Sequence, residues 1–163
     1  MTEKSYYWDG STTGDATLAK FNEFAYHGIW RKMFLRDRTI QGIIRGHLNE
    51  CEVEGVSGGV SVNTGAALVD GMFYENDAKL TIEIPTPSSS TRIDAIVLRR
   101  NATTQTIRAI RIVGTEGAGA PSIVQVEDGT WDLKIAEASI TTAGVITVTD
   151  YRENAKSPII TRS

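Results

Sequence analysis

The chain has 163 residues, which suits one domain, and 40% of them are hydrophobic, which is enough to form a core. Seventeen lysines and arginines stand against twenty aspartates and glutamates, and this acidic balance argues against a dedicated nucleic-acid-binding protein. No run of ~18 apolar residues predicts a transmembrane helix, and Cys51, the one cysteine, rules out an internal disulfide.

Residues 1–14 predict an N-terminal aromatic arm. Tyr6, Tyr7 and Trp8 are followed at once by a turn-forming Asp-Gly pair. Three aromatic side chains are unfavourable on a free surface, so we expect them to pack on their own domain or on a partner chain. They are the first candidates for an assembly interface.

Residues 15–38 predict one amphipathic α-helix. Apolar residues recur there at helical spacing, at Leu18, Phe21, Ala25, Ile29 and Met33. Phe24, Trp30 and Phe34 widen this stripe to more than one face, and such a helix is usually enclosed by neighbours. Those neighbours are either the rest of the domain or copies of the same helix. Phe21, Phe24, Trp30 and Phe34 therefore join the candidate interface.

Residues 39–152 predict a β-rich domain, followed by an extended C-terminal tail at 153–163 that we expect to reach a neighbouring chain. Short apolar or alternating segments are separated by glycine-containing turns, and they predict strands near 48–53, 60–62, 66–74, 80–84, 93–98, 106–113, 123–126, 131–140 and 145–148. The continuous apolar run at 93–98 is typical of a strand covered on both faces. The fold class expected is mainly β, an antiparallel sandwich or barrel preceded by the helix.

The residues that could carry chemistry do not form a recognisable site. Cys51 lies between Glu50 and Glu52, a negative setting that predicts a raised thiol pKa and an unreactive, buried side chain. His27 and His47 are the only histidines, and neither has another potential metal ligand at the spacing that metal sites use. We therefore expect no catalytic, cofactor-binding or metal-binding residue, and a protein that is not an enzyme.

Asp94 is the one acidic residue placed inside an apolar strand. A buried carboxylate needs a partner, and Arg152 and Arg99 are the candidates, with a structural salt bridge between Asp94 and Arg152 as the prediction. The alternative is a catalytic acid. The same structural interpretation covers Asp150 and its neighbour Arg152.

Several of these segments, taken in order, resemble a β-module of tailed-bacteriophage baseplate, tail-fibre and adaptor virion proteins. The resemblance spans about 49–152 together with the opening at 7–10, and it is carried by Val60–Gly71, Tyr74, Arg92–Arg99, Gln105–Arg108, Gly114–Gly117, Pro121, Trp131–Leu133 and Thr147–Arg152. It implies a structural role in a virion, commonly as a homotrimer, with synthesis in the host bacterial cytoplasm and no catalytic residues to carry over. Related proteins often continue into a long receptor-binding region, whereas the sequence in hand stops at Ser163, so we expect an adaptor, a plug-like connector or a decorating subunit.

The first functional hypothesis is a non-enzymatic component of the tail, baseplate or fibre attachment that docks to other virion proteins. A capsid cement or decoration protein is the second. The third is a carbohydrate- or receptor-binding module in which Trp8, Trp30 and Trp131 stack on a host surface glycan. An enzyme with an unrecognised site is the fourth. None of the first three predicts a nucleic-acid or membrane partner.

Overall fold

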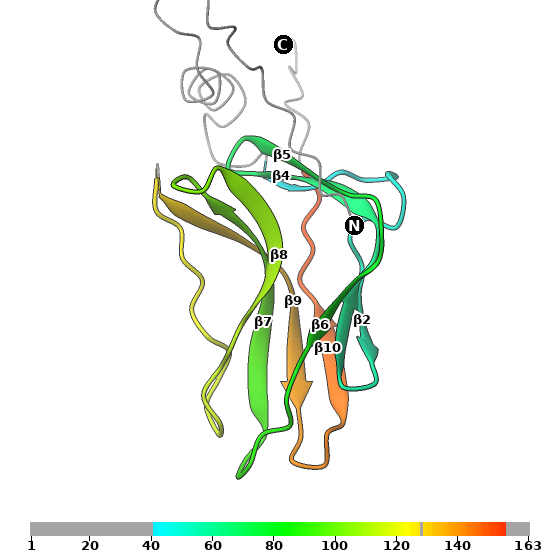
Figure 1. Ribbon diagram of the computed structural model, residues 1–163, viewed down its shortest axis with the longest axis vertical. Coiled ribbons are helices and arrows are strands. Elements are labelled where there is room, and N and C mark those ends of the chain that lie inside the picture. Colours follow the sequence, from blue (N-terminus) through cyan, green and yellow to red (C-terminus); the bar gives the residue numbers. More distant parts are fainter. Residues whose placement is uncertain (1–40, 128, 156–163) are drawn as a thin grey trace, which may run out of the picture.

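The computed structural model describes residues 41–127 and 129–155. Within these residues the chain forms ten β-strands in three sheets and no helix (Figure 1). The predicted arm at 1–14, the predicted helix at 15–38 and all but the first three residues of the predicted tail at 153–163 lie outside the described residues.

The largest sheet has four antiparallel strands in the order β10-β9-β7-β8. They are β7 (Arg92–Asn101), β8 (Thr106–Ile112), β9 (Thr130–Ile140) and β10 (Ile146–Asp150). All four residues from Ala95 to Leu98 are fully buried, although successive side chains of a strand point to opposite faces. The prediction of a strand covered on both faces is therefore confirmed for β7.

A second sheet has the order β2-β3-β6, all antiparallel. It consists of β2 (Val53–Val56), β3 (Gly59–Val62) and β6 (Leu80–Glu83). Its β2 edge lies against β10 of the larger sheet, where a Cβ on Gly55 would be 3.5 Å from the Ile146 carbonyl oxygen. The two sheets approach each other closely on this side.

The third sheet, in the order β1-β4-β5, lies across one end of the molecule, at the top of Figure 1. It consists of β1 (Gly42–Ile43), β4 (Gly65–Val69) and β5 (Met72–Asn76). On the outer side of β1, Ile43 forms a parallel bridge to Asn154. The first and last described segments of the chain therefore lie side by side.

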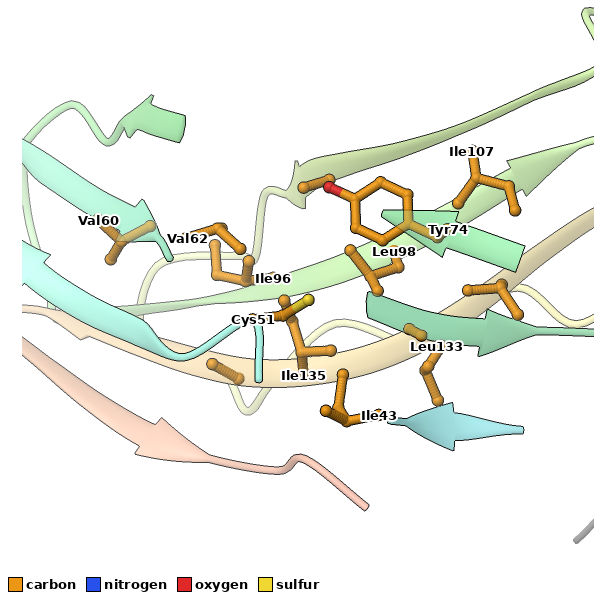
Figure 2. Packing of buried hydrophobic residues seen from close by; sticks show 14 of the residues in the cluster. Ile43, Cys51, Val60, Val62, Tyr74, Ile96, Leu98, Ile107, Leu133 and Ile135 are labelled. Atoms are coloured by element: carbon orange, nitrogen blue, oxygen red, sulfur yellow. The ribbon is translucent and has the colours of Figure 1, made fainter. Parts of the chain in front are cut away.

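All three sheets contribute side chains to a single hydrophobic cluster (Figure 2). Val60 and Val62 come from β3, Tyr74 from β5, and Ile96 and Leu98 from β7. Complete burial of one such side chain stabilises the fold by ~1.5–3 kcal/mol. The prediction of a mainly β, antiparallel fold is confirmed, and none of the three sheets closes into a barrel.

Three of the predicted strands were wrong. The segment 66–74 is two strands, because Asp70 and Gly71 both have positive φ (48° and 78°) and form a two-residue hairpin turn. Most of 48–53 is a turn with left-handed residues, and Val53 alone belongs to a strand. In 123–126 the pairing is limited to an isolated bridge between Gln125 and Trp131.

Candidate functional site

Asp94 is fully buried, as expected, but its partner is not Arg152. Its Oδ1 accepts a hydrogen bond from Arg92 Nε at 2.8 Å, and Arg92 Nη2 reaches Oδ2 at 3.1 Å. Arg111 Nη1 lies 3.5 Å from the same carboxylate. The predicted bridge between Asp94 and Arg152 was therefore wrong. Arg92 is two residues away on the same face of β7, a spacing from which sequence reasoning could have found it.

Arg152 pairs with acidic residues at the end of β10. Its Nη2 lies 2.8 Å from Asp150 Oδ2 and 3.9 Å from Glu52 Oε1. The hydrogen bond from Arg152 lowers the pKa of Asp150. The structural interpretation of Asp150 with Arg152 is confirmed, and the side chain of Asp150 is 57% exposed, so this pair contributes little to stability.

Two further buried aspartates pair with arginines, and neither pair was predicted from the sequence. The carboxylate of Asp132, on β9, accepts two hydrogen bonds from Arg99, one from Nε at 2.7 Å and one from Nη2 at 2.8 Å. Asp70, in the turn between β4 and β5, lies 2.9 Å from Arg100 Nη2, and both side chains are at most 5% exposed. Because these partners are distant in sequence, only the strand register could have revealed them.

The buried aspartates also fasten the segment that connects β8 to β9. Gly114 donates its backbone N–H to Asp94 Oδ1 at 2.9 Å, and Val124 donates its own to Asp132 Oδ2 at 2.8 Å. At Gly114 a Cβ would lie 1.9 Å from the Ile93 carbonyl oxygen, so only glycine fits there. Both ends of the connection are thus attached to the four-stranded sheet.

Two loops at the opposite end of the molecule from β4 and β5 are joined through Glu116. Its carboxylate accepts hydrogen bonds from the backbone N–H groups of Ser88, Ser89 and Ser90 and from the hydroxyls of Ser88 and Ser89. The Ser89 hydroxyl bond, together with the backbone bonds, lowers the pKa of Glu116 to about 2. The glycine- and serine-rich sequence here therefore forms a carboxylate-centred clasp.

Cys51 lies in the hydrophobic core, and His47 lies beside β5. Cys51 is fully buried, and burial raises the pKa of its thiol to about 12, so the thiol stays protonated near neutral pH. His47 Nε2 lies 3.3 Å from Glu75 Oε1 on β5. Among residues 41–127 and 129–155, no three His, Cys, Asp or Glu side chains gather to hold a metal ion. In the same ranges no helix is long and apolar enough to cross a membrane.

The residues predicted for an assembly interface all belong to the first 40 positions, outside the described residues. They are Tyr6, Tyr7, Trp8, Phe21, Phe24, Trp30 and Phe34. The described domain does show where that segment joins it, because Trp131 Nε1 donates a hydrogen bond to Gln41 Oε1 at 2.8 Å. Trp131 itself is buried, so it offers no ring face to a sugar, contrary to the carbohydrate-binding hypothesis.

Gln41, where the N-terminal segment meets the described domain, adjoins the β1-β4-β5 sheet, and large apolar side chains reach the surface there. Leu48 is 58% exposed and Phe73 is 38% exposed. Leu48 sits in a turn held by backbone hydrogen bonds from Asn49 and Cys51 to the Thr64 carbonyl.

Comparison with known proteins gives one structural likeness. No family model matches the chain, and no curated protein matches it. The crystal structure of the gene 22 product of the Bacillus subtilis SPP1 phage is similar, with 11% sequence identity and a TM-score of 0.48 over 74% of this chain and 91% of that chain.

Proposed function

We propose that this protein is a non-enzymatic structural component of a tailed-phage virion, in the tail, baseplate or fibre attachment. It works by forming a homo-oligomer, with a trimer favoured, and by docking to other virion proteins. The observation that carries the proposal is the ordered series of segments between 49 and 152 that resembles β-modules of such proteins.

The placement of aromatic residues supports an assembly role. Eight of the twelve aromatic residues lie in the first 40 positions, and the four that remain are Phe73, Tyr74, Trp131 and Tyr151. Aromatic side chains dominate the energetics of protein interfaces, because each removes a large area from water. A segment so rich in them, joined to a domain that already has its own core, is suited to binding other chains.

Buried ion pairs connect strands and loops of the described domain, as suits a docking module. Three buried carboxylates, those of Asp70, Asp94 and Asp132, pair with arginines and connect neighbouring segments. Truncating one partner of a buried pair is strongly destabilising, so such pairs hold one arrangement of loops and strands. Partners would meet a surface of constant shape.

Oligomeric state tests the assembly part of the proposal. Light scattering of the full chain should give three times the 17.8 kDa protomer mass. Trp8→Ala and Phe24→Ala should weaken the trimer, whereas Tyr151→Ala, on the described domain, should leave it intact. A monomer at every concentration would contradict the proposal.

Location tests the virion part. Antibodies against the purified chain should label the tail of phage particles that contain it, in immunogold electron microscopy. Label on the head would favour the capsid cement alternative. Glycan binding lost in Trp8→Ala would favour the receptor-binding alternative, and absence from purified particles would refute a virion role.

A further inference from the structure

The loop between β6 and β7 gathers hydrogen-bond donors around one carboxylate. The backbone N–H groups of Ser88 and Ser89 each donate to Glu116 at 2.8 Å, the first to Oε1 and the second to Oε2. The N–H of Ser90 reaches Oε2 at 3.3 Å, and the Ser89 hydroxyl reaches it at 2.6 Å. Successive backbone N–H groups that converge in this way form an anion-binding concavity. The loop therefore has the donors that an oxyanion site requires.

Positive charge next to this loop also favours an anion there. Arg92 binds the buried Asp94 carboxylate, and Arg111 Nη1 lies 3.5 Å from the same group, so these three residues carry one net positive charge. The hydrogen bond to Asp94 raises the pKa of Arg92, and the negative charge of Glu116 adds to that rise. Arg92 Nη2 also donates to the Pro85 carbonyl at 2.8 Å, which ties the two ends of the loop together. Glu116 thus balances a positive charge that is fixed in place.

Glu116 reaches the serines from a separate part of the chain, the connection between β8 and β9. The backbone on both sides of Glu116 is held by other hydrogen bonds. Gly114 donates its N–H to Asp94 Oδ1 at 2.9 Å, and Gly117, with a φ of 73°, donates its N–H to the Thr91 carbonyl at 2.9 Å. Because these bonds do not involve the Glu116 side chain, we expect both loops to keep their positions when its carboxylate is removed. The donors would then surround an unfilled site.

We propose that residues 88–90 form a carboxylate-binding site that Glu116 fills from within the same chain. Glu116 is an exchangeable occupant, and a carboxylate of another molecule takes its place when the Glu116 side chain is withdrawn. A short tether gives the resident group an effective concentration in the mM range or above, so weak ligands do not displace it. The site does not involve the N-terminal aromatic residues, so its failure would leave the proposed assembly role untouched.

Replacement of the lost carboxylate by acetate tests the site in the full-length chain. Glu116→Ala removes the resident group, and sodium acetate is compared with sodium chloride at equal ionic strength. In proton–nitrogen NMR spectra, the amide signals of Ser88, Ser89 and Ser90 should move with acetate and reach saturation in the mM range. The same signals of the parent chain should hardly move, because Glu116 holds the site. No saturable movement in the variant, or equal movement in the parent, would overturn the proposal.

Thermal unfolding gives a second readout with matched controls. Acetate should raise the melting temperature of Glu116→Ala more than that of the parent, because a ligand of the folded state stabilises it. Glu83→Ala, which removes an exposed carboxylate from β6, should respond as the parent does. Adding Ser89→Ala to Glu116→Ala should weaken acetate binding about tenfold, because a hydrogen bond to a charged group is lost. Equal shifts in every variant would indicate a general salt effect and refute the site, and so would failure of Glu116→Ala to fold.

Discussion

Replacing Asp94 by alanine should cause one of the largest stability losses available to a single substitution in this domain. The carboxylate is fully buried, and the Arg92 side chain, bound to it through two nitrogens, is 10% exposed. Removing one partner of a buried ion pair costs about 3–5 kcal/mol, because the other charge is left uncompensated. The Gly114 N–H would also lose its acceptor. Domains of this size are stabilised by only ~5–15 kcal/mol, so the loss would be a large fraction of the total.

Urea unfolding followed by circular dichroism measures this loss directly. The matched control is Asp150→Ala, which breaks an ion pair on a mostly exposed aspartate and should cost at most about 1 kcal/mol. The double variant with Arg92→Ala should lose less than the sum of the two single variants, because the partners act together. Similar small losses for Asp94→Ala and Asp150→Ala would refute the role given to the buried carboxylate.

Three other measurements test separate features. Because the folded pKa of Glu116 is about 2 and its ordinary value is 4.5, the stability that Glu116 contributes should be complete above pH 4.5 and decline as the pH falls toward 2. Glu116→Gln should therefore destabilise the chain at pH 7 and approach the parent near pH 2 in thermal unfolding, and a pH-independent difference would contradict this. Gly114→Ala should cost about 1–3 kcal/mol or more by overpacking against the Ile93 carbonyl, seen as a lower urea midpoint, whereas an unchanged midpoint would show that the backbone moves aside freely. The Cys51 thiol should stay unreactive toward a thiol reagent at pH 8 until urea unfolds the domain, and rapid labelling of the folded chain would show that the thiol is not buried.

The sequence predicted the strands whose pattern was strong. The apolar run in β7 and the patterns in β8 and β9 predicted three strands, because burial imposes such patterns directly, but they did not show that these strands share a sheet. The Asp70-Gly71 pair is a common two-residue hairpin signal, and apolar residues on both sides concealed it within one long segment. Nothing in the composition of 48–52 indicates three left-handed residues there. That conformation is held by contacts with Thr64 and Gly65.

The ion pairs show a second boundary between what sequence can and cannot predict. A buried Asp94 was predictable from its apolar strand, and Arg92 was within reach of the same periodicity. Asp132 and Arg99 lie 33 residues apart, so they meet only because β7 and β9 pair in one particular register. Register depends on the whole sheet, and no local pattern encodes it.

The parallel bridge between Ile43 and Asn154 has a practical consequence. A domain whose first and last residues lie side by side can be inserted into a surface loop of a host protein without forcing the two ends of that loop apart. Residues 41–155 are therefore a good candidate for grafting through two brief glycine–serine connections. The same adjacency favours circular permutation, with new termini opened at the exposed bend around Ala143 between β9 and β10.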